Sequence, residues 1–108
     1  MKVLNSALTE ICEAIRSAVK ADRIYLFGSH AYGTPNEDSD LDFFIVIPDE
    51  GIKPLEAIRQ VRFALIPLKR KTSVDILADY RSRFDQRSKL NTLERTIANE
   101  GVLLYVRT

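Results

Sequence analysis

Four carboxylates stand within six positions of the sequence, between a glycine–serine pair and an apolar stretch. The acids are Glu37, Asp38, Asp40 and Asp42, in the segment GSHAYGTPNEDSDLD that begins at Gly28. The residues FFIVI follow directly and have the composition of a buried strand. Acids at the head of a buried strand, just after a Gly-Ser pair, indicate a site where charge is used for chemistry.

The Asp-x-Asp pair is typical of a site for a hard divalent cation. Strand alternation predicts that Asp40 and Asp42 share one face of their strand. Two carboxylates that close raise each other's pKa unless a cation lies between them, and Mg²⁺ prefers such oxygen ligands. A two-metal site needs a third carboxylate. Asp75 is the candidate, because an acid flanked by Val, Ile and Leu is unusual within a strand. If the strand that contains Asp75 lies beside the strand that begins at Asp40, Asp75 can face the same way as Asp40 and Asp42.

The Gly-Ser pair supplies the elements of a phosphate cradle. Gly28 ends a strand and allows a tight turn. The backbone N–H groups that follow it, together with the Ser29 hydroxyl, are able to hold phosphate oxygens at a helix N-terminus. A D-x-D alone is usually a solvated turn, but its combination with this cradle and Asp75 indicates phosphoryl or nucleotidyl transfer.

The elements expected around these residues belong to one domain, residues 1–108. Apolar residues at helical spacing predict a helix over 5–19, and Leu55, Ile58, Val61 and Leu65 predict a second one that starts near Pro54. Residues 81–101 read as helical in two pieces. Strands are expected over 23–27, 40–47, 72–78 and 102–106. This order predicts the α/β class, with a small mixed β-sheet covered by helices.

The bulk composition excludes several other classes of protein. A 45% hydrophobic content is globular, and the single cysteine, Cys12, excludes an intramolecular disulfide and is expected in the core. No apolar run is long enough to cross a bilayer, and no signal pattern opens the chain, so we expect a cytoplasmic protein without a membrane role. A net charge of +1 gives no reason to expect direct nucleic-acid binding. Basic side chains near the C-terminus form either a docking face for an acidic surface or a solvated face: Arg81, Arg83, Arg87 and Lys89.

The pattern Gly28-Ser29, ten residues, Asp40-Leu41-Asp42 resembles the DNA polymerase beta-like nucleotidyltransferase superfamily. The resemblance covers essentially the whole chain, including the ending ANEGVLLY, and implies a polymerase beta palm-like fold. It implies that Asp40 and Asp42 are catalytic and bind Mg²⁺, with Asp75 as the third metal-binding carboxylate. It also implies that Gly28 and Ser29 contact the phosphates of ATP or another NTP.

The chain is most similar in size to the minimal nucleotidyltransferases of bacteria and archaea. Many of these are antitoxins encoded with a HEPN-domain ribonuclease toxin, and some transfer AMP from ATP to a tyrosine of that toxin. The family loop often reads G-S-x-A-R-G, whereas Tyr32 stands here where the arginine is common. A cationic contact to phosphate is therefore lost or supplied elsewhere, with His30 as one weak candidate.

Three functions remain open at this point. The first is Mg²⁺-dependent transfer of AMP to a hydroxyl of a partner protein, with the toxin as the expected acceptor. The second is a nucleotide-binding antitoxin subunit that acts by contact without catalysis. The third is transfer to a small molecule with the help of a partner subunit, because no second domain is left to form an acceptor pocket. Self-association is a further option for completing the cleft.

Overall fold

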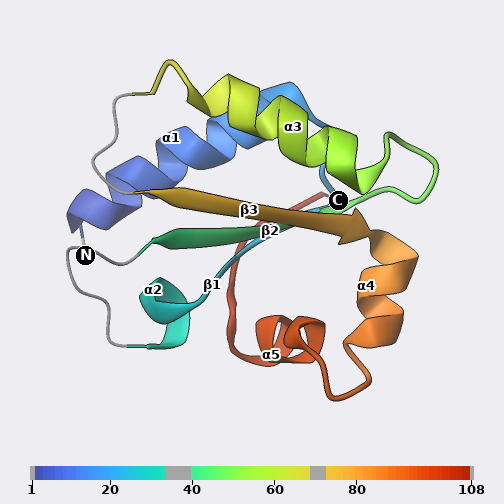
Figure 1. The fold of residues 1–108 in the computed structure, drawn as a ribbon. Helices are drawn as coiled ribbons and strands as arrows, with labels where there is room; N and C mark the ends of the chain where they lie inside the picture. The colour runs from blue at the N-terminus through green and yellow to red at the C-terminus, as the bar shows by residue number, and fades with distance from the viewer. Residues whose placement is uncertain (1, 34–39, 69–72, 108) are drawn as a thin grey trace.

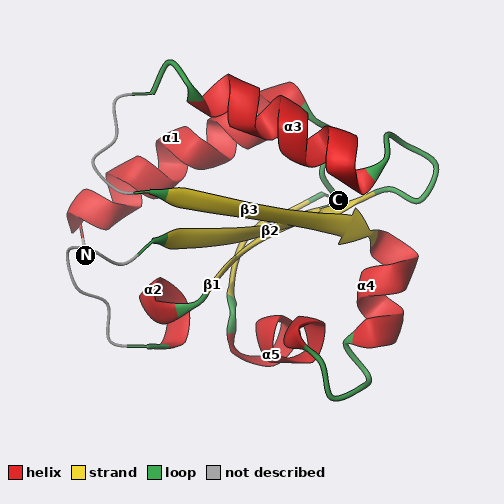
Figure 2. Ribbon diagram, in the orientation of Figure 1, coloured by secondary structure: helices red, strands yellow, loops and turns green. Residues whose placement is uncertain are grey.

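The computed structural model describes residues 2–33, 40–68 and 73–107, and within them the strands form one mixed sheet. The strand order is β3-β2-β1-β4. β1 pairs antiparallel with both β2 and β4, whereas β2 and β3 run parallel (Figure 2). The predicted mixed α/β architecture is therefore confirmed. The bounds are β1 Arg23–Phe27, β2 Leu41–Ile47, β3 Val74–Tyr80 and β4 Val102–Val106.

Helices lie on both faces of this sheet (Figure 1). α1 and α3 cover one face, and α2, α4 and α5 lie on the other side. None of the helices in the described ranges has the length and apolarity needed to cross a membrane. Their bounds are α1 Lys2–Ala18, α2 Ser29–Tyr32, α3 Pro54–Leu65, α4 Arg81–Arg87 and α5 Leu93–Glu100.

Strand alternation divides the buried residues into two cores. The larger core lies between the sheet and the helices α1 and α3, and β2 contributes Phe43 and Ile45 to it. The intervening residues of β2, Phe44 and Val46, point to the other face and pack with Phe84 of α4. Because β2 is buried on both faces, its sequence is an almost continuous apolar run.

The second face of the sheet is covered only in part. Phe84 and Ile97 from α4 and α5 are fully buried against it. Towards the start of β3, however, Asp75 is exposed and Leu77 is 38% exposed. The end of the sheet that carries Asp75 is therefore open to solvent or to a ligand.

The helix predicted from Leu55, Ile58, Val61 and Leu65 is confirmed as α3, but these residues do not all face the core. Ala57, Val61 and Leu65 are buried against the sheet, but Leu55 is 80% exposed. At 100° per residue, Leu55 lies well away from the direction shared by Val61 and Leu65, so it points outwards. The apolar residues used to predict this helix therefore lie on two faces: Val61 and Leu65 on the buried one and Leu55 on an exposed one.

Cys12 packs at the edge of the larger core, as expected. It is partly buried, and burial raises the pKa of its thiol to about 11, against a smaller opposing effect of Arg16. The side chain is therefore a thiol at neutral pH, with little nucleophilic character.

A buried carboxylate at the start of β1 joins the two ends of the fold. Asp22 is 5% exposed, accepts a hydrogen bond from Nε of Arg107 at 2.7 Å and forms an ion pair with Nη2 of the same guanidinium at 2.6 Å. Its backbone N–H donates to Val46, and its carbonyl accepts from the N–H of Arg107. Arg81, the first residue of α4, lies 3.9 Å from the same carboxylate. One acid thus connects β1, β2, α4 and the segment after β4.

Replacing Asp22 by Asn should destabilise the chain, because the partly exposed Arg107 guanidinium would lose a buried, ionised acceptor. We expect the free energy of unfolding to fall by about 1–3 kcal/mol in urea denaturation. Glu56→Gln is the matched control, since its ion pair with Arg59 is exposed and should change stability by less than about 0.5 kcal/mol. Equal effects of the two substitutions would contradict the role given to Asp22.

Candidate active site

Two carboxylates meet across the parallel pair of β2 and β3. Asp42 is the second residue of β2, Asp75 is the second residue of β3, and the strand register places them directly opposite each other. Neighbouring strands are about 4.8 Å apart, and paired residues point to the same face. The sequence-based hypothesis that Asp75 faces the same way as Asp42 therefore agrees with the observed register.

The surroundings of Asp42 disfavour its ionised form. Burial is the largest cause of a raised pKa for this carboxyl, followed by the negative charges of Asp75 and Asp40 and by a hydrogen bond with Asp75. His30 has a smaller, opposing effect. A bound cation would relieve the repulsion between these acids.

Asp40 lies beside this pair but outside the strand. β2 begins at Leu41, one residue later than the strand predicted from the sequence. The N–H of Leu41 donates to the backbone carbonyl of Ser73. Asp40 is thus the residue just before the paired strand and is exposed, and its placement on the same face as Asp42 stays a prediction. Its charge nevertheless acts on Asp42, so it remains close to the carboxylate pair.

Gly28 allows the backbone after β1 to pass directly beside Asp42. Its φ of 81° and ψ of −159° belong to a region that essentially only glycine adopts. A Cβ atom built on Gly28 would overlap Oδ2 of Asp42. The glycine is thus required both by the backbone conformation and by the space that the carboxylate occupies.

The short helix α2 follows this glycine. Ser29 is its first residue, and the N–H of Ala31 donates to the carbonyl of Gly28 at 3.0 Å. The first N–H groups of a helix have no acceptor within the helix, which makes such a turn suitable for anions. His30, which the sequence gave little weight, lies near enough to Asp42 to affect its pKa. The Tyr32 side chain, which stands where the family often has an arginine, lies outside the side chains that the structure describes.

The donor set of this site consists of carboxylate oxygens, which suits a hard divalent cation such as Mg²⁺. Among residues 2–33, 40–68 and 73–107, however, no group of three His, Cys, Asp or Glu side chains is arranged to hold a metal ion. The Asp42–Asp75 pair would hold the cation, with Asp40 nearby. Mg²⁺ usually takes one or two protein carboxylates, and the phosphates of its nucleotide complete the coordination.

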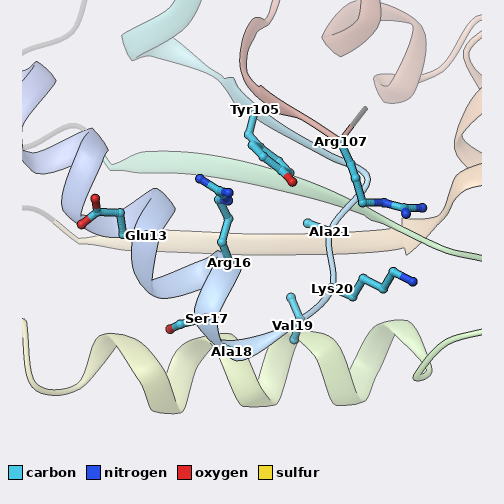
Figure 3. Close-up of a pocket in the computed structure, with 9 residues that line it drawn as sticks. All are labelled: Glu13, Arg16, Ser17, Ala18, Val19, Lys20, Ala21, Tyr105 and Arg107. Carbon is cyan, nitrogen blue, oxygen red and sulfur yellow. The ribbon is translucent and has the colours of Figure 1, made fainter.

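A cavity of about 590 Å³ does not include any of these residues (Figure 3). It lies between the end of α1 and β4. Two of its cationic side chains are already engaged, because Arg107 binds Asp22 and the Arg16 guanidinium lies 4.2 Å from the centre of the Tyr105 ring. The paired carboxylates beside Gly28, rather than this cavity, have the chemistry of a reaction centre.

The model of the nucleotidyltransferase domain family matches residues 8–104 of this chain. The chain belongs to that family. The matched residues include every candidate residue of the nucleotidyltransferase site, from Gly28 to Asp75. No curated protein matches the chain.

Two solved structures share the fold of this nucleotidyltransferase. One is a Sulfolobus solfataricus protein assigned as a nucleotidyltransferase, with a TM-score of 0.61 and 21% identity, over 91% of this chain and 76% of that one. The other is a toxin–antitoxin structure with AMP-PNP, with a TM-score of 0.55 and 22% identity, over 93% of this chain and 73% of that one. At these identities the likeness establishes the fold alone, and it confirms the predicted nucleotidyltransferase fold.

Gly28→Ala should damage both the fold and the site of the nucleotidyltransferase. The backbone conformation alone should lower the free energy of unfolding by about 1–3 kcal/mol, and the added methyl group should displace the Asp42 carboxylate and weaken Mg²⁺-ATP binding. Urea denaturation and calorimetric titration measure the two effects. Gly51→Ala is the control, because a Cβ there meets only the Pro48 carbonyl at 3.6 Å. Unchanged nucleotide affinity in Gly28→Ala would remove Gly28 from the site.

Asp42→Asn should be more stable than the parent at neutral pH when no divalent ion is present. The pKa of Asp42 is raised above its ordinary value of 3.8, so ionisation of this carboxyl destabilises the fold above the raised pKa and has no effect well below 3.8. The stability difference should therefore shrink as the pH falls through the raised pKa towards 3.8. Urea unfolding of both proteins in EDTA over a pH series measures it, and a difference that does not depend on pH would refute this account.

Proposed function

We propose that this nucleotidyltransferase transfers AMP from ATP to a hydroxyl group of a partner protein, with Mg²⁺ as cofactor. The observation that carries the proposal is the Asp42–Asp75 pair next to Gly28 and Ser29. Transfer of a nucleotide needs a cation site beside a phosphate site, and this arrangement supplies both sets of ligands. Because ATP chemistry of this kind belongs to the cell interior, the proposal includes a cytoplasmic location.

Each residue of the proposed site has a distinct task. Asp42, Asp75 and the adjacent Asp40 would hold Mg²⁺, and Gly28 and Ser29 would hold the triphosphate. When bound, Mg²⁺ neutralises the phosphates and stabilises the leaving group. The acceptor hydroxyl oxygen forms a bond to the α-phosphorus, and pyrophosphate leaves with the electron pair of the bond that breaks. Asp75 orients the acceptor hydroxyl and takes its proton. Asp75 is exposed at the open end of the sheet, so an acceptor from outside can reach it.

The open end of the sheet favours a large acceptor over a small molecule. Asp75 is exposed and Leu77 is 38% exposed. A protein surface that brings its own wall to the site is compatible with this geometry. A small acceptor would need a pocket from a partner subunit.

The toxin–antitoxin structure with AMP-PNP supports an antitoxin role as part of the proposal. In this role the chain inactivates a HEPN ribonuclease toxin by modifying it. The competing candidate is a nucleotide-binding antitoxin that acts by contact alone. The carboxylates distinguish the two, because a contact-only subunit has no use for a repelling pair of acids.

Asp75→Asn should separate binding from transfer. We expect Mg²⁺-ATP affinity close to that of the parent, since Asp40, Asp42 and the phosphate cradle remain to hold the Mg²⁺ that arrives with the triphosphate. Transfer should fall by at least about 100-fold, because Asp75 is needed for the attacking hydroxyl. The assay uses α-labelled ATP with proteins extracted from the source cells, beside a calorimetric titration. Glu50→Gln, an exposed acid outside the strands, is the control and should transfer at the parent's rate.

Two outcomes would contradict this proposal. If Asp75→Asn still labels its acceptor at the parent's rate, Asp75 has no part in the transfer. If the parent labels no protein but still inhibits a toxin that it binds, the contact-only function replaces the enzymatic one.

A further inference from the structure

The outer face of α3 carries large apolar side chains that the fold leaves in solvent. Leu55 is 80% exposed, Phe63 is 76% exposed and Ile66, which ends the helix, is 71% exposed. The opposite face of the same helix is fully buried in the larger core. Exposed apolar residues gathered on one helix face are typical of a protein-interaction site. We call Leu55, Arg59, Arg62, Phe63 and Ile66 the α3 ridge.

The spacing of the α3 ridge is that of a helix-packing seam. Leu55, Arg59, Arg62 and Ile66 follow one another at intervals of four, three and four residues, so they align along one side of α3. Phe63 lies directly beside this line. A seam with this spacing accepts a second helix packed along its length. Its ends are apolar, and its middle is formed by two arginines.

The charges of the α3 ridge determine what sort of helix fits. Arg59 is bound to Glu56 at 2.9 Å, and the second oxygen of Glu56 accepts from Gln60 at 3.1 Å. Arg62 is exposed and makes no ion pair with any residue of the described ranges. The middle of the seam therefore carries an unbalanced positive charge.

A second copy of the chain is a poor occupant of the α3 ridge. In an antiparallel two-fold contact, Arg59 of each copy would face Arg62 of the other. In a parallel contact each arginine would face its own counterpart. Both arrangements place like charges together in the centre of an interface, and Glu56 is already engaged.

The basic side chains of α4 do not offer an alternative docking face. Arg81 lies near Asp22, Arg83 binds Asp79 at 3.1 Å, and Arg87 binds Glu94 at 2.9 Å. These arginines, considered from the sequence as a surface for an acidic partner, are largely neutralised by acids of the chain itself. The combination of exposed apolar residues and an unbalanced cation is found instead on α3.

We propose that the α3 ridge docks an amphipathic helix of another protein, one that is apolar at its ends and acidic in its middle. α3 packs on the face of the sheet opposite Asp42 and Asp75, so the docked helix leaves the carboxylate pair accessible (Figure 1). The inference does not depend on nucleotidyl transfer, since it concerns a different face of the molecule.

Two synthetic helical peptides test this proposal against the full-length chain. Both carry leucines at the ends of the seam, and they differ only in having two glutamates or two lysines in its middle. Fluorescence anisotropy should show that the glutamate peptide binds at least about tenfold more tightly than the lysine peptide. Arg62→Glu should reverse this preference, and Phe63→Ser should abolish binding of both.

The controls address folding and the competing occupants. Leu103→Ser, which replaces an exposed apolar residue on β4, should leave peptide binding unchanged, and thermal melts should show that all variants are folded. Binding of neither peptide, or equal binding of both, would overturn the proposal. Light scattering that shows a dimer, converted to a monomer by Phe63→Ser, would assign the ridge to a second copy. Cosedimentation with anionic lipid vesicles that Phe63→Ser abolishes would assign it to a membrane surface, and either result would contradict the proposal.

Discussion

The repulsion between Asp42 and Asp75 is the constraint on which the rest of this site depends. Burial is the largest cause of the raised pKa of Asp42, and the parallel pairing of β2 and β3 raises it further by placing the Asp75 carboxylate beside it. Such an arrangement is unfavourable in a protein that has no use for it, because either residue could be replaced without loss to the core. It becomes favourable when a cation lies between the acids. Gly28 fits the same explanation, because its backbone conformation is open to glycine and the absence of a Cβ leaves room for the Asp42 carboxylate.

The two faces of the sheet differ in function: one holds the main core, and the other carries the acids of the proposed site. The face under α1 and α3 contains most of the apolar core and gives the strands their register. The other face is closed at one end by Phe84 and Ile97 and open at the other, where the acids lie. The proposed nucleotide site can therefore be polar and exposed without weakening the main core. Asp22 and Arg107 stabilise the far end of the sheet, away from the chemistry.

Much of this arrangement could be predicted from the sequence, since it depends on local patterns. The apolar runs and their flanking glycines located the strands at 23–27 and 102–106, and the Gly-Ser and Asp-x-Asp spacing indicated the family. Strand neighbours could not be derived in this way, because the pairing of β2 with β3 depends on packing across the whole sheet. The displacement of Asp40 from the strand and the outward direction of Leu55 were missed for a related reason. A periodic pattern does not specify where a ladder of hydrogen bonds begins, nor which of two overlapping helix faces meets the core.

The central claim is that Asp42 and Asp75 together hold a divalent cation beside a nucleotide at Gly28 and Ser29. The most direct measurement is anomalous scattering from Mn²⁺ in crystals grown with a non-hydrolysable ATP analogue. The account predicts a Mn²⁺ peak within coordination distance of both carboxylates and of the analogue's phosphates, with those phosphates against the turn after Gly28. A nucleotide and metal bound elsewhere, such as in the cavity between α1 and β4, with Asp42 and Asp75 still in contact only with each other, would contradict it.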